Sequence, residues 1–312
     1  MNIKKKVYEN DLAEEIYLDK KPVIKAAIIG TILVVSGFFI NFPMKQKIDN
    51  FIIGKIKSNK NCPITYEQLN FSMFLLPKID ANGINVPARC FGGKTSALNL
   101  DNLNVSVERP SFFPFGVRTK IVAKAESSHI TAYPSLSMGT HIIKVMPSIV
   151  TTSLIASFLK LPTKLAGKLN LQGLFYTNFD FKKVEKGSFL VTSNDLGLMN
   201  QRVMGFNIPN LFVGNLELKG RIKNSNIISI LKLKLGATGA PIELLIQDGE
   251  IRIHKSRTEL SKVKMEGKIR FSEDFLKKIP VGFLLGKAQM DDQGFYRIKL
   301  NGTFSKLMPQ FL

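Results

Sequence analysis

The apolar residues of this chain repeat with two different periods. From Ile64 onward they mostly alternate with polar residues, as in the segments 98–107 and 117–125. A period of two places successive side chains on opposite faces of a strand, so that one face is apolar and the other is wet. The pattern therefore predicts a mainly β domain made of half-buried strands.

A single stretch near the N-terminus is apolar throughout. Ala26 to Phe42 contains no charged residue, and extending the stretch back to Val23 adds only Lys25. A run of roughly 17 to 20 apolar residues matches the hydrocarbon thickness of a bilayer, and a lysine at its end can reach the headgroups. We therefore expect a cytoplasmic tail over residues 1–22 and a transmembrane helix over residues 23–43.

A cleaved signal peptide and a buried core helix are the alternatives to this membrane anchor. A signal peptide fits less well because the preceding tail carries several acidic residues and no A-x-A-like cleavage site follows. Lysines flank the stretch on both sides, so charge favours a cytoplasmic N-terminus only weakly. The tail is too short to form a hydrophobic core, whereas the segment after Pro43 is long enough to form one. We therefore expect an uncleaved anchor with a cytoplasmic N-terminus, and a folded domain over residues 44–312 on the other side of the membrane.

Three further helices are expected. Isoleucines at helical spacing predict a short amphipathic helix over residues 48–56. Apolar residues at i, i+4, i+8 and i+11 predict a helix over residues 150–161, which begins after Pro147-Ser148. A third, short helix is predicted between Ser272, as its N-cap, and Pro280, which stops it. The last two helices are natural covers for a sheet whose inner face is otherwise exposed.

Turn residues predict hairpins in the second half of the chain. An Asp-Gly pair favours a two-residue turn, and at Asp248-Gly249 such a turn would set Ile246 opposite Ile251. The apolar residues on both sides would then share one face. Asp292-Gln293-Gly294 is a second, looser turn signal before another alternating segment.

An apolar frame with a central glycine recurs four times in the second half of the chain. The steps between the glycines are about 47, 47 and 35 residues, which is the range of repeat architectures, although chance recurrence in a β-rich chain is an alternative. A glycine at the same place in several strands suggests a shared bend or bulge. We therefore expect an elongated, curved antiparallel sheet with a few covering helices, with a boundary between two sub-repeats near residues 162–168. The repeat glycines are Gly173, Gly220, Gly267 and Gly302.

Two cysteines, Cys62 and Cys90, both lie beyond the predicted anchor. Their spacing is compatible with one disulfide in an oxidising compartment, and also with two unrelated buried thiols. A bridge would stabilise the fold by roughly 3 to 4 kcal/mol on the chain-entropy argument.

The formal net charge is +20, which is compatible with nucleic acid, an anionic membrane or an acidic protein as partner. The basic residues alternate with apolar ones, as in the segment 231–235, and no nucleic-acid-binding motif accompanies them. We therefore expect a solvated cationic face and no nucleic-acid partner. Attraction to anionic headgroups is the minority alternative.

No motif points to catalysis or to a cofactor. The segment 91–95 lacks the first glycine and the helix of a phosphate-binding loop, and the segment 236–241 is a turn rather than a dinucleotide fingerprint. His129, His141 and His254 lie far apart without further ligands at metal-binding spacing. We therefore expect no catalytic, metal or cofactor site and no enzyme.

Beyond these patterns, a short basic tail and one predicted membrane span precede the segments 64–71 with 77–79, 235–241 with 248–251, and 294–302. With these segments, nearly the whole chain after Lys21 resembles a known family, the N protein of the type II secretion system, which is related to AsmA-like envelope proteins. The resemblance is carried by structural glycines and apolar alternation, and no catalytic or ligand residue can be transferred from it. It implies a bitopic inner-membrane protein with a periplasmic β domain, accessory to a machine that moves folded proteins across the outer membrane.

Two functions are compatible with this resemblance. In the first, the domain is a scaffold whose edge strands and cationic face contact other periplasmic or inner-membrane secretion components. In the second, the sheet is a trough that binds or transfers lipid, holding the acyl chains of phospholipid or lipopolysaccharide. Whether the two helices close the inner face distinguishes the two.

Overall fold

The computed structural model divides into two units, residues 1–54 and 55–312. It describes residues 28–31, 50, 54, 61–72, 76–91, 96–112, 115–137, 139–159, 164–178, 183–199, 201–203, 206–208, 210–254, 260–278, 285, 289–303 and 306–312.

In the first unit, residues 28–31 are helical. The predicted tail (1–22), the rest of the predicted anchor (23–43) and most of the predicted amphipathic helix (48–56) lie outside the described residues. No helix in the described part of the chain combines the length and the apolar character needed to cross a membrane.

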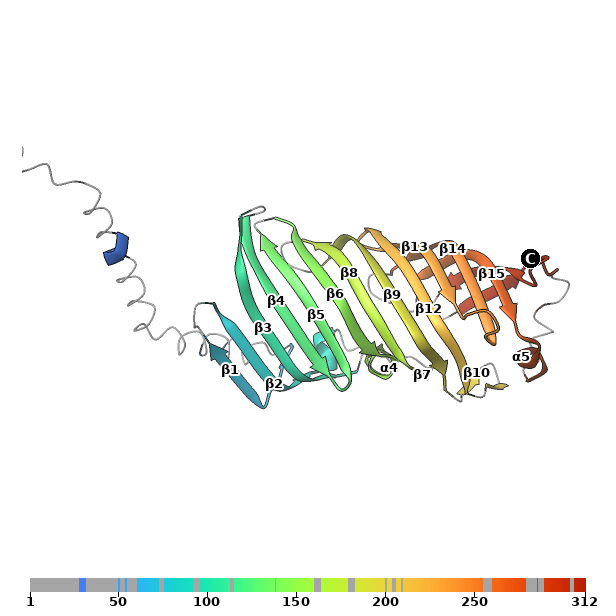
Figure 1. Ribbon diagram of the computed structural model, residues 1–312, viewed down its shortest axis with the longest axis horizontal. Helices are drawn as coiled ribbons and strands as arrows, with labels where there is room; N and C mark the ends of the chain where they lie inside the picture. The colour runs from blue at the N-terminus through green and yellow to red at the C-terminus, as the bar shows by residue number, and fades with distance from the viewer. Residues whose placement is uncertain are drawn as a thin grey trace, which may run out of the picture. The chain divides into compact units, whose positions relative to one another are not determined.

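The second unit is mainly β, as the alternating pattern predicts, and forms one large antiparallel sheet (Figure 1). Its first half comprises β1 (Gln68–Ser72), β2 (Lys78–Val86), the 3-10 helix η1 (Ala88–Phe91), β3 (Leu98–Phe112), β4 (Phe115–Ala125), β5 (Ser128–Ser137), β6 (His141–Thr151), α4 (Thr152–Leu159), β7 (Leu165–Ala166) and β8 (Lys168–Thr177). Its second half comprises β9 (Val184–Leu198), β10 (Gln201–Val203), β11 (Phe206–Ile208), β12 (Leu211–Asn224), β13 (Ile227–Leu235), β14 (Ile242–Arg252), β15 (Lys262–Phe271), α5 (Glu273–Lys278), β16 (Tyr296–Thr303) and β17 (Lys306–Phe311).

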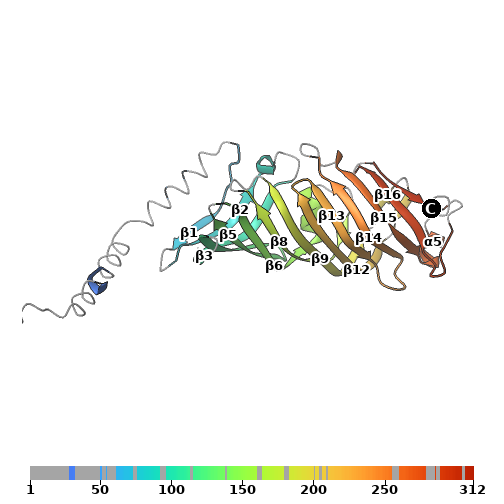
Figure 2. The ribbon, with the colours of Figure 1, turned by 90° about the horizontal axis from the view of Figure 1, so that it is seen from above.

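The long strands pair in chain order. Both views show them side by side from β1 to β15 (Figures 1 and 2). β16 and β17 continue the sheet, β7 is added on β9, and β10 and β11 form a separate two-stranded sheet. At about 4.8 Å per strand, the sheet is roughly 60 Å wide. β1 and β17 end the path and do not pair with each other, so the sheet is open. β6 pairs directly with β8, so the sheet continues across the predicted boundary near 162–168.

The register aligns side chains in rows that cross the strands, because residues opposite each other in antiparallel strands share a face. One row crosses the whole sheet from β1 to β17, and every member is apolar, glycine or proline. We call it the central row, and its face the apolar face. Its members are Phe71, Ile79, Val105, Ile121, Ala132, Val145, Gly173, Phe189, Gly220, Ile230, Gly249, Met265, Leu300 and Pro309.

A neighbouring row on the other side of the sheet has the opposite character. From β6 to β16 it contains Lys144, Leu174, Ser188, Arg221, Ser229, Glu250, Lys264 and Asn301. We call this side the polar face. The alternation along each strand thus separates apolar from charged residues, as the sequence predicts.

The predicted hairpin turn at Asp248-Gly249 is wrong. β14 runs straight through both residues: Asp248 pairs with Glu266, and Gly249 lies between Ile230 and Met265. Pairing on both edges of the strand outweighs the local turn preference of Asp-Gly, and a register shift beside Asp248 absorbs the irregularity. The turn before β14 is instead the segment 236–241, where Gly236 and Gly239 have φ of 82° and 85°.

Both predicted helices of the second unit exist, but they cover little of the sheet. α4 begins at Thr152 rather than Val150, because Val150 still pairs with Leu169 and Pro147 is accommodated at a register shift in β6. The Ser272 cap is confirmed: its Oγ accepts a hydrogen bond from the Phe275 N–H at 3.2 Å. Both helices follow strands that end at one rim of the sheet, and with 8 and 6 residues they are only about 9 to 12 Å long. Over the described residues the helices cover the sheet only near this rim, where Phe275 of α5 packs against Leu211 and Val213 and Phe158 of α4 contacts Phe91 of η1.

Candidate functional site

The apolar face is the most extensive feature of the domain, and its two halves differ in packing. Two clusters of buried apolar residues occur in the described part of the chain, and both lie on β9 to β17 and α5. One contains Ile230, Ile246, Val263 and Met265, and the other joins Phe275 of α5 to Leu211 and Val213.

On β3 to β8, the apolar face has no such cluster among the described residues. Val105, Ile121, Ile143, Val145 and Leu171 are all half-buried. None of these five side chains is fully buried, although η1 after β2 and α4 after β6 meet, with the Phe91 and Phe158 rings 4.9 Å apart. A sheet face of this kind normally needs a second layer, so this half of the face can accept apolar material from outside the described fold.

Glycines alternate with large side chains along part of the central row. Gly173, Gly220 and Gly249 each lie between two larger neighbours. A Cβ built on Gly173 would lie 2.7 Å from the Phe175 ring, and one on Gly220 would overlap the Phe189 ring. One on Gly249 would lie 2.7 Å from Cγ of Met265. Large side chains therefore lie over the glycines and fill the space that a missing side chain leaves.

The four repeat glycines do not occupy one equivalent place. Gly173 and Gly220 lie in the central row, and Gly267 lies in the next row, between Ile246 and Ile298. These three lie at a register shift or opposite one. Gly302 pairs without a shift but has φ of 142°, a conformation open mainly to glycine. Each has a local structural explanation: a neighbouring phenylalanine ring at Gly173 and Gly220, a backbone oxygen at Gly267, and the positive φ at Gly302.

The sequence pattern places Gly249 in a turn and does not single out Phe189. It places Phe175 in the apolar frame of the repeat, but does not predict that its ring lies over Gly173. The available signal was parity: Phe175 and Gly173 are two residues apart, and a side chain at i+2 shares a face with residue i.

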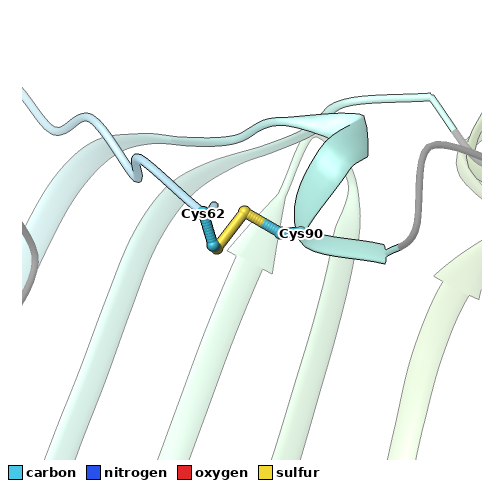
Figure 3. Close-up of a disulfide and its surroundings, with 2 residues drawn as sticks. All are labelled: Cys62 and Cys90. Atoms are coloured by element: carbon cyan, nitrogen blue, oxygen red, sulfur yellow. A yellow bond between two sulfur atoms is a disulfide. The ribbon is translucent and has the colours of Figure 1, made fainter. Parts of the chain in front are cut away.

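Cys62 and Cys90 are joined by a disulfide with an S–S distance of 2.03 Å (Figure 3). The bond links the segment before β1 to η1, which follows β2. It therefore ties down the first edge of the sheet, where β1 pairs only with β2.

The residues tested for chemistry remain apart. His129 lies on β5, and His254 follows β14. His141 on β6 is buried, and its Nδ1 accepts a hydrogen bond from the Ser137 N–H at 3.1 Å. Within the described ranges, no three His, Cys, Asp or Glu side chains gather as metal ligands would. Of the segment 91–95, only Phe91 is described.

Two carboxylates are held by the fold rather than presented to a ligand. Glu243 is 8% exposed and accepts two hydrogen bonds from Arg270, at 2.7 and 2.8 Å, and one from the Gly239 N–H at 3.0 Å. Arg270 also lies over the Phe295 ring, 4.5 Å from its centroid. Hydrogen bonds from the Lys168 N–H and the Ser193 hydroxyl lower the pKa of Asp195.

A comparison with protein-family models, curated proteins and solved structures found no match. The geometry of the apolar face is therefore the basis for assigning a function.

Proposed function

We propose that this protein binds the acyl chains of lipids on the apolar face of its sheet, in the manner of an AsmA-like lipid-binding or lipid-transfer protein. The observation that carries the proposal is the central row, which crosses all the long strands without a polar side chain. On β3 to β8 this row has no buried cluster above it among the described residues.

Acyl chains suit such a surface because their binding depends on the burial of apolar area and not on directional hydrogen bonds. Each methylene removed from water is worth about 0.8 kcal/mol, so a chain laid across several strands gains substantially. The line of register shifts and glycines along the central row supports a curved, elongated sheet, because both devices bend strands. A curved apolar face forms a trough that contacts a chain on more than one side.

Photo-crosslinking tests the proposal directly, because alternation supplies matched controls. Ile121 and Ile143 lie on the apolar face, whereas Val122 and Ile142 are their apolar neighbours on the polar face. All four side chains are half-buried. A benzophenone amino acid at Ile121 or Ile143 of the full chain should yield lipid adducts by mass spectrometry after mild detergent extraction, and one at Val122 or Ile142 should not.

Two results would contradict this function. Equal adducts at both members of each pair would mean that lipid surrounds the domain without preferring the apolar face. Adducts at neither position, together with no lipid in native mass spectrometry of the parent, would mean that the face is covered by protein.

We further propose that the domain lies in the periplasm, behind a single-pass inner-membrane anchor with a cytoplasmic N-terminus. The disulfide between Cys62 and Cys90 supports an oxidising compartment. A reporter active only in the cytoplasm and fused after Leu312 should be silent, and strong activity would overturn this topology. The chain carries the proposed function by binding, without catalysis or a cofactor.

A second candidate function is a scaffold of the type II secretion system, and the open sheet edges favour it. β1 and β17 each pair on one side only, and an unpaired strand edge can accept a strand from another protein. A cysteine at Gln310 on β17 should then crosslink to a secretion component in cells, whereas one at Asn170, inside the sheet, should not. Equal crosslinking at the two positions would contradict a partner at the edge.

A further inference from the structure

The charges of the polar face are compensated at the C-terminal end of the sheet. On β14 to β16, or in the turn before β16, four carboxylates pair with basic residues at 2.5 to 3.0 Å. The pairs are Glu250 with Arg252, Asp291 with Lys268, Glu243 with Arg270, and Glu266 with Lys299.

The middle of the polar face has more basic than acidic side chains. Six basic residues on β6 to β13 form what we call the basic patch: Lys144, Lys186, Lys219, Arg221, Lys232 and Lys234. Glu217 lies among them and pairs with Lys232 at 2.7 Å. Lys219 has Leu190 and Lys232 as its neighbours across the strands, and Arg221 has Ser188 and Ser229. Among the described residues, most of the positive charge of the patch therefore has no carboxylate that compensates it.

The basic patch surrounds a depression with an apolar lining. Its volume is about 830 Å³, and its walls include Leu174, Leu190 and Leu231 together with Lys144, Lys219 and Arg221. Leu231 is 39% exposed, unusually open for a leucine in a strand. A register shift between β12 and β13 places it as the extra residue between Ile230 and Lys232.

We propose that the basic patch docks the polar face of the sheet onto an anionic lipid bilayer. Lysine and arginine near such a surface are attracted by its negative potential, and apolar side chains between them can enter the headgroup region. An acidic polypeptide would satisfy the charges but would leave Leu231 and its neighbours in water. This docking uses the face opposite to the one that binds acyl chains, so it is independent of the proposed function.

Sedimentation with vesicles tests the docking. The full chain is held in nanodiscs of neutral phosphatidylcholine and mixed with heavy vesicles of phosphatidylcholine alone or with phosphatidylglycerol. The parent should sediment only with the anionic vesicles, and less at high salt, because salt screens exposed charges. The patch variant K144Q/K219Q/R221Q should lose about a hundredfold in its partition coefficient, since three basic residues leave the surface.

The matched control is K262Q/K264Q/R297Q, which removes the same net charge from exposed positions on the polar face of β15 and β16. It should retain most of the binding, and the charge-preserving variant K144R/K219R/R221K should bind like the parent. Unchanged circular dichroism verifies that each variant folds.

Three outcomes would overturn the docking: no preference of the parent for anionic vesicles, equal losses in the patch and control variants, or full displacement by soluble polyglutamate at matched ionic strength. The last would identify an acidic protein as partner. Replacing Ile143 on the apolar face by Asn should leave sedimentation unchanged, which separates this test from that of acyl-chain binding.

Discussion

The contact between Phe189 and Gly220 makes the most specific claim about how the sheet is built. The backbone of Gly220 is extended in β12 and its φ is not positive, so alanine is tolerated there by the backbone itself. The obstacle is the Phe189 ring, which occupies the place of a Cβ at this position. The ring is the end of a side chain and can move, but only by disturbing its packing.

The magnitude follows from two opposing terms. Overpacking lowers the stability of the folded state by about 1 to 3 kcal/mol. Replacing glycine by alanine in a compatible conformation raises stability by about 0.4 to 1 kcal/mol, because it reduces the conformational entropy of the unfolded chain. G220A should therefore lower the free energy of unfolding by about 1 to 2 kcal/mol, and the bulkier valine should lower it further. In an F189A background, the obstacle is gone and G220A should become neutral or stabilising.

A double-mutant cycle measures this coupling. Urea unfolding of the full chain, followed by far-UV circular dichroism because the chain has no tryptophan, gives the midpoint for the parent, both single variants and the double variant. The control is Gly267, where an added Cβ would overlap the backbone oxygen of Leu245, which cannot rotate away. G267A should therefore be destabilising in both backgrounds, and its effect should add to that of F189A.

Either of two results would refute this reasoning. If G220A costs as much without the Phe189 ring as with it, the ring does not explain the glycine. If G220V also folds normally but loses only lipid binding or secretion, Gly220 belongs to a binding site rather than to the sheet geometry.

Three further predictions concern stability. E243Q should lower the free energy of unfolding by about 2 to 3 kcal/mol. This is less than the 3 to 5 kcal/mol of a fully buried pair, because the Arg270 side chain is 31% exposed. R270K should have a smaller effect than E243Q in the same urea titration. Reducing the disulfide between Cys62 and Cys90, which closes a loop of 28 residues, should lower stability by about 3 to 4 kcal/mol, and C62S/C90S should abolish the effect of reductant. The lowered pKa of Asp195 means that its charged form stabilises the fold above its ordinary pKa of 3.8, and that this contribution is lost as the pH falls through the folded pKa. The stability difference between the parent and D195N should therefore shrink as the pH drops below 3.8, and a difference independent of pH would exclude the charge as its cause.

Some elements were predictable because their signals are local. The period of two around Val105 and Ile121 identifies strands with one apolar face, and the cap at Ser272 identifies the start of α5. The disulfide pair was a reasonable expectation, since only two cysteines are present.

By itself, the sequence determined that the domain is mainly β, with apolar residues on one side of its strands and charged residues on the other. Strand alternation enforces this separation, whatever the neighbours are. The tertiary structure alone decided which strands pair, and therefore that Asp248-Gly249 lies inside β14 and that one apolar row crosses the sheet. It also decided that basic residues outnumber their carboxylate partners on β6 to β13, because compensation depends on carboxylates from neighbouring strands. The register of a strand depends on all the pairs that it forms with both neighbouring strands. A short segment of sequence therefore does not determine it.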